Sequence, residues 1–315
     1  MNNKKVAVCS RSFSRNKVLR EKLSERYPLS TFNDEGVKLQ GDSLVAFLRG
    51  HEKAIIALEN IDETILKQLP ELEVISKYGV GLDMIDMSAM HSHYKLLGWS
   101  GGVNRRSVSE LVISFAIALL RHVPSSYREV LSGTWRQHVG SYLSGKTVGI
   151  IGCGAIGQDL SVLLKAFDCQ IIVNDIQDYS EFYELNHIKP VGLDQLLKSA
   201  DIVTLHTPLD DSTRNILNRQ KLELMKPSAI LINAARGGLV DEVALRNMLQ
   251  DNRIAAAAFD VFAVEPPEDK ELLELPNFLV TPHIGGSAEE AILAMGMAAI
   301  EGLDNAKDPL VFVRN

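Results

Sequence analysis

Cysteine is scarce in this chain, and its scarcity narrows the possible chemistry. Only three of 315 residues are cysteine, namely Cys9, Cys153 and Cys169, and they show no CxxC or Cys/His spacing. A disulfide framework and a structural zinc site are therefore not expected, and we predict no bound metal. Unpaired cysteines suit a reducing compartment, so we expect a cytoplasmic protein.

Long hydrophobic runs and an excess of positive charge are also missing. The most apolar run, Leu111–Leu120, is about half the length of a membrane-crossing helix. The N-terminus lacks the long apolar core of a secretory signal. The net charge is −7, which is not typical of proteins that bind nucleic acid or anionic membranes. We therefore expect no transmembrane segment and no nucleic-acid or membrane partner.

Hydrophobic residues, by contrast, are plentiful and occur in short runs. They make up 46% of the chain, enough to fill two cores of ordinary size. Apolar segments such as 53–58 and 73–79 alternate with amphipathic helical stretches over the first hundred residues, and a second such series occupies residues 147–283. This rhythm predicts the α/β class, with mostly parallel sheets buried on both faces.

Two helix-start signals suggest where the chain crosses between domains. Ser107 with Glu110, and Ser287 with Glu290, have the S-x-x-E spacing of a capping box. One domain would then comprise residues 1–104 completed by 288–315, and the other residues 105–287.

A glycine-rich turn follows the strand expected at residues 147–151. Gly152, Gly154 and Gly157 have the spacing G-x-G-x-x-G. In such a motif the first glycine permits a tight turn, the second lets a pyrophosphate approach the backbone, and the third lets the helix pack on the strand. Backbone N–H groups at the helix start favour the phosphate charge. Such turns also serve as simple tight connections, so the spacing alone leaves both interpretations open.

Asp175 favours the dinucleotide interpretation. It ends the next expected strand, near the distance of about 20 residues at which an acid accepts hydrogen bonds from the ribose hydroxyls. A carboxylate there repels a 2′-phosphate, and no arginine is adjacent, so we expect NAD rather than NADP. The alternative is a loop aspartate that caps a turn.

Three polar residues follow later strands of the same series. Arg236, Glu265 and His283 each lie where a strand is expected to end, and ligands gather at this edge of an open parallel sheet. Histidine can move the hydroxyl proton that hydride exchange at a carbinol requires. A neighbouring carboxylate favours the protonated ring, and an arginine binds a substrate carboxylate. Singly, the three could equally be a surface ion pair, a loop acid and a packed histidine.

Eight segments occur in a fixed order along the chain: KYGVGLDMID, RSVSELV, GTW, GKTVGIIGCGAIG, LHTPL, INAARGGLVDE, AAFDVF and TPHIGG. In this order and spacing they resemble the D-isomer-specific 2-hydroxyacid dehydrogenase family, which includes phosphoglycerate, glycerate, D-lactate and formate dehydrogenases. The resemblance implies a central Rossmann NAD-binding domain and a split flavodoxin-like substrate domain built from both chain ends. It also implies a homodimer joined through the Rossmann domains near Leu111–Leu120. The chain after TPHIGG is too short for the regulatory tail of some phosphoglycerate dehydrogenases, so no such tail is expected.

The activity implied by the resemblance is hydride transfer between NAD(H) and a small D-2-hydroxy acid or 2-oxo acid. Arg236 would bind the substrate carboxylate and carbonyl, His283 would be the acid/base, and Glu265 would orient and charge His283. The residues implied to hold the cofactor are Gly152, Gly154, Ala155, Ile156, Gly157, Asp175, His206, Thr207, Pro208, Ala234, Ala235, Arg236, Asp260, His283, Gly285 and Gly286. Those implied to hold the substrate are Tyr78, Gly79, Val80, Gly81, Asn104, Arg105, Arg236 and His283.

Two departures from the family pattern leave the substrate open. Met84 stands where the family often has asparagine, and Arg105 and Arg106 form an unusual adjacent pair. If either arginine reaches the substrate, the acid would carry a second anionic group, which would be a phosphate or another carboxylate. Otherwise the pair would bind helix or loop carbonyls. A second class of function also stays open, because NAD(H)-sensing corepressors resemble this family and keep its site.

Overall fold

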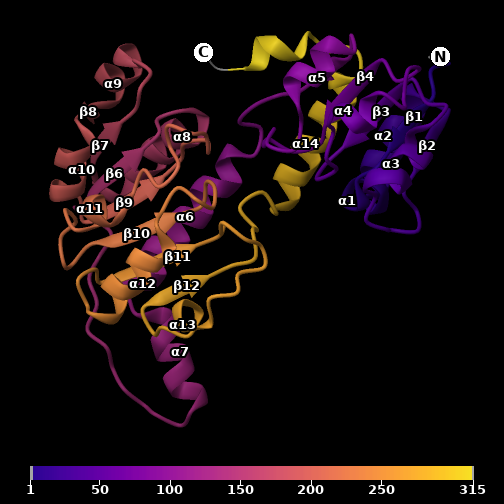
Figure 1. The fold of residues 1–315 in the computed structure, drawn as a ribbon. Coiled ribbons are helices and arrows are strands. Elements are labelled where there is room, and N and C mark those ends of the chain that lie inside the picture. The colour runs from indigo at the N-terminus through magenta and orange to yellow at the C-terminus, as the bar shows by residue number, and fades with distance from the viewer. Residues whose placement is uncertain (1–2, 314–315) are drawn as a thin grey trace. The chain divides into compact units, whose positions relative to one another are not determined.

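The computed structural model describes residues 3–313, which form two compact units. Unit 1 comprises the chain up to Asn104 together with the segment from Ala288 onward, and unit 2 comprises Arg105–Ser287. Each unit contains one sheet with helices packed around it (Figure 1). All strand pairs within both sheets are parallel. The expected α/β class is confirmed.

Unit 1 has a five-stranded sheet in the order β2-β1-β3-β4-β5. Its strands are β1 Val6–Val8, β2 Ser30–Phe32, β3 Lys53–Ile56, β4 Val74–Lys77 and β5 Leu96–Gly98. Its helices are α1 Arg11–Arg15, α2 Lys17–Arg26, α3 Gly41–Leu48, α4 Glu63–Leu66, α5 Met87–Ser92, α14 Glu289–Gly302 and the 3-10 helix η2 Pro309–Phe312. Every residue of β1, β3 and β4 is buried, as expected for parallel strands covered on both faces.

Helix α14 completes unit 1 from far along the chain. It packs against β5 so closely that a Cβ on Gly98 would lie 2.2 Å from the Gly302 carbonyl oxygen. The buried Lys53 ammonium donates to the Tyr27 hydroxyl at 2.8 Å and to the Leu303 carbonyl at 2.5 Å. Tyr27 also hydrogen-bonds Asp304. Glycine packing and a buried polar network thus tie the early and late segments together.

Unit 2 has a seven-stranded sheet in the order β12-β11-β10-β9-β6-β7-β8. Its strands are β6 Thr147–Ile151, β7 Gln170–Asn174, β8 Lys189–Pro190, β9 Ile202–Leu205, β10 Ile230–Asn233, β11 Ala256–Phe259 and β12 Phe278–Val280. Its helices are α6 Arg105–Leu120, α7 Val123–Leu131, α8 Ala155–Leu164, the 3-10 helix η1 Lys165–Phe167, α9 Ser180–Asn186, α10 Leu193–Ser199, α11 Arg219–Leu222, α12 Glu242–Gln250 and α13 Lys270–Leu273.

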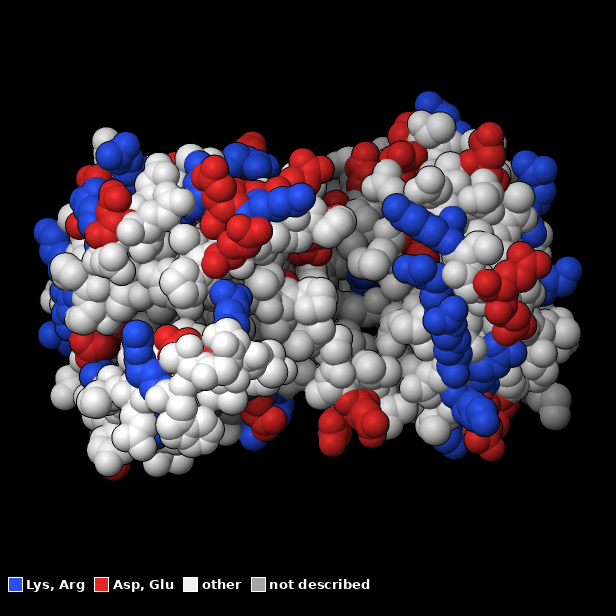
Figure 2. Space-filling model, turned by 90° about the horizontal axis from the view of Figure 1, so that it is seen from below, with Lys and Arg blue, Asp and Glu red and all other residues white. Residues whose placement is uncertain are grey.

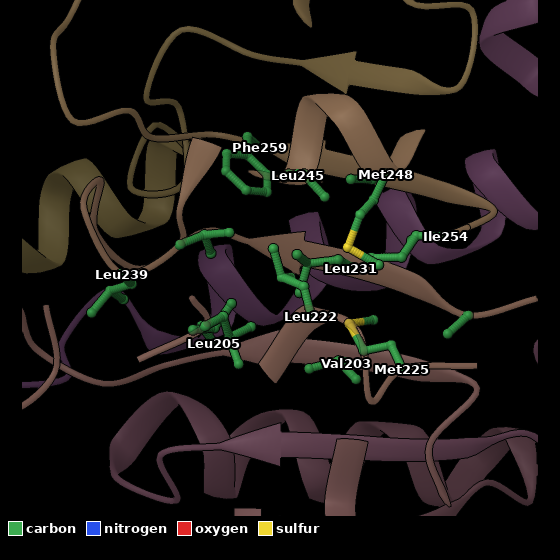
Figure 3. Close-up of a cluster of buried hydrophobic side chains, with 14 of the residues drawn as sticks. Val203, Leu205, Leu222, Met225, Leu231, Leu239, Leu245, Met248, Ile254 and Phe259 are labelled. Atoms are coloured by element: carbon green, nitrogen blue, oxygen red, sulfur yellow. The ribbon is translucent and has the colours of Figure 1, made fainter. Parts of the chain in front are cut away.

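The core of unit 2 is built where helices cover the sheet. Figure 3 shows one apolar cluster, in which β9 and β10 contribute Val203, Leu205 and Leu231. Leu245 and Met248 from α12 pack onto the same cluster. This packing fixes α12, and with it the loop that precedes α12, on the sheet.

Both capping boxes expected from the sequence are wrong. Helix α6 begins at Arg105, so Ser107 lies in its first turn and donates its hydroxyl to the Gly285 carbonyl at 2.6 Å. Helix α14 begins at Glu289, and its N-cap is Ala288, which makes no side-chain capping bond. A tertiary partner takes the hydroxyl of Ser107, while the backbone N–H of Ser287 closes a turn onto Ile284 at 2.8 Å.

Helix α7 and the segment after it are unusual in unit 2 because their apolar side chains are uncovered. Helix α7 has no buried residue, and Tyr127, Leu131 and Trp135 are 65%, 70% and 84% exposed. Among residues 3–313, no helix by itself has the length and apolarity to cross a bilayer. Helices α6 and α7 pass that test only together, by length and composition, with a 61° bend between them.

Candidate active site

The three polar residues singled out by the sequence lie on neighbouring loops of unit 2. Arg236, Glu265 and His283 follow β10, β11 and β12, and these strands are adjacent in the sheet. Because all three strands are parallel, their carboxyl ends meet at one edge. The loops at this edge are therefore close enough to act on a common ligand.

His283 and Glu265 face each other directly. His283 Nδ1 lies 2.9 Å from Glu265 Oε2 and 3.2 Å from Oε1. The Phe262 N–H donates to Glu265 Oε1 at 3.1 Å and so holds the carboxylate in place. His283 has a left-handed φ of 54°, a conformation that functional sites often impose. With Nδ1 engaged by the carboxylate, Nε2 is the ring atom available to exchange a proton.

Asp260 anchors the loop that carries His283. Its buried carboxylate accepts hydrogen bonds from the Thr281 hydroxyl at 2.5 Å, the Ile284 N–H at 2.7 Å and the Gly285 N–H at 2.7 Å. A carboxylate accepts about four hydrogen bonds, so one further donor fits. Sequence reasoning gave Asp260 a cofactor role only and missed this support of the histidine loop.

Arg236 lies on a turn that a buried asparagine holds. Asn233 Nδ2 donates to the Arg236 carbonyl at 2.8 Å, and Asn233 Oδ1 accepts from the Ala235 N–H at 3.2 Å. A Cβ on Gly237 would lie only 1.9 Å from the Phe262 carbonyl carbon. The arginine turn therefore packs directly on the loop that leads to Glu265. Sequence reasoning missed Asn233, although a polar residue that ends an apolar strand was a usable signal.

The glycine motif forms a tight loop between β6 and α8. Gly152 has φ 95°, and a Cβ there would lie 2.6 Å from the His206 carbonyl carbon. A Cβ on Gly157 would lie 2.3 Å from the Gly152 carbonyl oxygen. Gly154 differs, because a Cβ there would meet nothing within 4 Å. It is the N-cap of α8 and makes no side-chain capping bond, so the helix start is open to an anion.

Asp175 lies beside this loop. Its carboxylate accepts from the Cys153 N–H at 2.5 Å and from the Gln177 N–H at 2.8 Å. The bond from Gln177 is the turn-capping contact expected of a loop aspartate. The bond from Cys153 places the carboxylate against the glycine loop. Burial raises the pKa of Cys153 to about 12, so this cysteine of the loop stays a neutral thiol at pH 7.

His206, Thr207 and Pro208 follow β9, the neighbour of β6. His206 Nε2 lies 2.9 Å from the Thr204 hydroxyl, and the buried Nδ1 has no hydrogen-bond partner among residues 3–313. Burial lowers the pKa of His206 to about 3. The ring is therefore neutral at physiological pH, which suits a wall of a cofactor groove better than acid/base chemistry.

The Tyr78–Gly81 loop belongs to unit 1 and follows β4. Gly79 has φ 124°, and the Trp99 indole donates to the Val80 carbonyl at 3.0 Å. Within the described chain, no hydrogen bond uses the backbone N–H of Gly79, Val80 or Gly81. The buried Lys77 ammonium donates to the Ala57 carbonyl at the base of this loop. Lys77 was missed from the sequence, and its signal is a lysine inside an apolar strand.

Arg105 and Arg106 are the first two residues of α6. Arg106 forms a two-pronged ion pair with Asp159 of α8, with distances of 3.0 Å and 2.9 Å. Burial alone would raise the pKa of Asp159, but hydrogen bonds from Arg106 and Ser109 outweigh it and lower that pKa. Arg106 thus joins α6 to α8, which differs from the carbonyl contacts expected of a structural arginine.

The structure thus brings the expected residues together in separate groups. The edge of unit 2 gathers Arg236, Glu265, His283 and Asp260, with Ala234 and Ala235 before the arginine and Gly285 and Gly286 after the histidine. The glycine loop, with Ala155 and Ile156 at the start of α8, forms a second group with Asp175. Tyr78–Gly81 and Asn104 belong to unit 1. No cluster of His, Cys, Asp or Glu within residues 3–313 is suited to hold a metal.

Comparison with known proteins gives consistent matches. The model of the NAD binding domain of the D-isomer specific 2-hydroxyacid dehydrogenases matches residues 113–285. The D-3-phosphoglycerate dehydrogenase of Methanocaldococcus jannaschii is 39% identical over 244 residues, which are 76% of this chain and 47% of that protein. The chain spans about half the length of the phosphoglycerate dehydrogenases it matches.

Other relatives match along most of their length. The hydroxypyruvate reductase of Thermotoga maritima is 35% identical over 270 residues, which cover 84% of this chain and 87% of that protein. A solved structure from a Polaromonas species, assigned to the D-isomer specific 2-hydroxyacid dehydrogenases, superimposes with a TM-score of 0.87 at 27% identity and covers 96% of both chains.

Proposed function

The chain belongs to the D-isomer specific 2-hydroxyacid dehydrogenases, and we propose on this premise that it transfers a hydride between NAD(H) and a small D-2-hydroxy acid or its 2-oxo acid. In this proposal, residues 105–287 are the NAD-binding domain, and residues 1–104 with 288–315 are the substrate domain. The observation that carries the proposal is the His283–Glu265 pair, 2.9 Å apart, beside the loop of Arg236.

Each residue of the pair has a distinct part in the proposed reaction. When bound, the nicotinamide supplies or accepts the hydride. In the reduction direction, His283 Nε2 gives its proton to the oxygen of the 2-oxo group, and Glu265 stabilises the charged ring that precedes this step. Arg236 binds the substrate carboxylate and polarises the carbonyl with its guanidinium group. The backbone N–H groups of Gly79, Val80 and Gly81, which take part in no hydrogen bond within the described chain, are further donors that this proposal assigns to the substrate carboxylate.

The glycine loop and Asp175 support NAD(H) as the cofactor. The open helix start at Gly154 fits a pyrophosphate. The carboxylate of Asp175 lies at the same loop, where it would accept ribose hydroxyls and repel a 2′-phosphate. Three cysteines with free thiols are consistent with a reducing, cytoplasmic location.

Helix α7 and the segment up to Tyr142 support a homodimer through the NAD-binding domain. Leu131, Trp135 and Tyr142 leave large apolar side chains uncovered there. In Figure 2, seen from the side of α7, uncharged side chains cover much of the part that belongs to unit 2. Exposed apolar surface of this kind marks an interaction site. A second copy of the chain is the partner we propose, and we place the contact on these exposed side chains rather than on Leu111–Leu120, where most residues are buried or half-buried within unit 2.

The experiment that tests this function compares turnover with binding. The protein is assayed for NADH oxidation with pyruvate, glyoxylate, hydroxypyruvate and phosphorylated 2-oxo acids, and NADH binding is titrated by fluorescence in parallel. We expect turnover with at least one acid, and far better use of NADH than of NADPH. Tight NADH binding without turnover on any acid would favour the NAD(H)-sensing alternative, and equal use of both cofactors would refute the role of Asp175.

A further inference from the structure

We propose that Glu242 is a positioning residue for the active site, because it holds the Phe262–Ala263 peptide, which packs on the Arg236 turn and directly follows the peptide whose N–H binds Glu265. Glu242 is the first residue of α12 and lies outside the groups assigned from the sequence. The kinetic part of this inference rests on the proposed function, whereas its structural part does not.

The carboxylate of Glu242 reaches across to the loop after β11. Its Oε1 accepts a hydrogen bond from the Ala263 N–H at 2.9 Å. The start of α12 does not need this carboxylate as a cap, since Asp241 is the N-cap and accepts from the Ala244 N–H at 2.9 Å. Two adjacent acids at one helix start thus do different things: Asp241 caps the helix, and Glu242 ties the helix to the catalytic loop.

The peptide between Phe262 and Ala263 is the point at which three elements meet. Glu242 holds the N–H of Ala263, and the neighbouring Phe262 N–H donates to Glu265 Oε1 at 3.1 Å. A Cβ on Gly237, next to Arg236, would lie 1.9 Å from both the carbonyl carbon and oxygen of Phe262. A shift of this peptide would therefore move the carboxylate partner of His283 and the support of the arginine turn together.

Few other contacts on the side of Glu242 could hold the loop in place if this hydrogen bond were lost. A cavity of about 180 Å³ lies beside the loop, and its lining includes Glu242 and Ala263. Packing on that side is thus incomplete. Glu268 and Asp269 line the same cavity as Glu242, and Arg246 of α12 binds Asp269 at 2.8 Å.

The electrostatics of the site indicate which substitution is conservative. Burial raises the pKa of Glu242, Asp269 raises it further, and the Ala263 N–H offsets part of the shift. The charged form of Glu242 is thus disfavoured in the folded protein. Replacing Glu242 with neutral glutamine is therefore not expected to destabilise the protein at pH 7. The amide oxygen of the glutamine can still accept from Ala263.

Four variants separate positioning from simple stabilisation. Glu242→Ala removes the acceptor of the Ala263 N–H, and Glu242→Asp shortens the side chain that carries it. Both variants should lower kcat about 10- to 100-fold and raise KM for the 2-oxo acid. Both should also shift the pH–rate profile in the same direction as Glu265→Gln. Glu242→Gln should stay within about twofold of wild type. Asp241→Ala removes the adjacent cap and should lower Tm without moving the pH profile. NADH affinity should be unchanged in all four.

A measurement without turnover keeps this inference separate from the proposed function. The nitrogen chemical shifts of the His283 ring report the bond between Nδ1 and the Glu265 carboxylate. Glu242→Ala and Glu242→Asp should alter them as Glu265→Gln does, while Glu242→Gln and Asp241→Ala should not. Absence of turnover in the wild type would contradict the proposed function but not the positioning role of Glu242. Wild-type ring shifts in Glu242→Asp, or equal changes in Asp241→Ala, would overturn the positioning role of Glu242.

Discussion

At the scale of single residues, the proposed chemistry depends on a histidine with one nitrogen occupied and one free. Glu265 engages Nδ1, and the Asp260 carboxylate binds the Thr281 hydroxyl before the histidine and two backbone N–H groups after it. Loss of the ring and loss of its partner should therefore have different kinetic effects.

Substitution of His283 by glutamine should lower kcat by about 10²- to 10⁴-fold, because it removes the general acid/base. NADH binding should change little. Glu265→Gln should instead shift the pH–rate profile, since a neutral amide no longer favours the protonated ring. Steady-state kinetics across pH, with NADH titrations as the control, check both. Retention of most of the wild-type kcat by His283→Gln would show that another group moves the proton.

The glycines of the loop provide a second residue-scale prediction with an internal control. Gly154 has space for a methyl group, whereas a Cβ on Gly157 would meet the Gly152 carbonyl oxygen at 2.3 Å. Gly154→Ala should leave Tm nearly unchanged but weaken NADH binding about tenfold or more, because the methyl group occupies the space proposed for the pyrophosphate. Gly157→Ala should lower Tm by several degrees. Unaltered NADH affinity in Gly154→Ala would argue against the pyrophosphate position.

At the level of residues, the sequence predicted which polar side chains follow the strands, but not the hydrogen bonds that hold them. Arg236, Glu265 and His283 could be found because each follows an apolar run, and parallel strands bring such residues to one edge. The supporting bonds of Asn233 and Asp260 could not be found, since they depend on how each loop turns back on itself. The partner of Arg106 is Asp159, and no local pattern joins these two positions.

At the scale of elements, the apolar runs predicted the buried strands well and missed two of the four edge strands. The two missed strands are β2, Ser30–Phe32, and β8, Lys189–Pro190. No residue of either is fully buried, and edge strands are short, polar and tolerant of proline for this reason. The capping box at Ser107 failed because its hydroxyl binds a tertiary partner, the Gly285 carbonyl, and the one at Ser287 failed because the helix starts later, with Ala288 as its N-cap.

The contact between β5 and α14 carries an element-scale prediction. Gly98→Ala would place a methyl group 2.2 Å from the Gly302 carbonyl oxygen, and neither backbone can yield without separating helix from sheet. The free energy of unfolding should fall by about 1–3 kcal/mol or more. Gly192→Ala is the control, because a Cβ at Gly192 has open space. This substitution should lower the free energy of unfolding by less than about 1 kcal/mol. Urea denaturation measures both, and similar losses in the two variants would contradict the close packing.

At the scale of the whole molecule, the uncovered side chains of α7 and the following segment predict the assembly state. The wild type should sediment as a dimer. Leu131→Asp combined with Trp135→Asp should convert it to a monomer, because two charges replace large apolar groups in the proposed interface. Leu185→Asp, at another exposed position, is the control and should stay dimeric. A monomeric wild type, or a dimeric double variant, would refute the proposed interface.

The completion of unit 1 by α14 also affects how the protein is made. Lys53 and Leu303, which hydrogen-bond in the finished fold, are 250 residues apart in the chain. Unit 2 is one uninterrupted segment, so it can fold on the ribosome before unit 1 is complete, although its synthesis starts later. Strands β4 and β5 therefore wait without their covering helix for roughly ten to forty seconds at about 5–20 residues per second. During this interval an apolar sheet face is open to chaperones, and the synthesis of α14 ends that dependence.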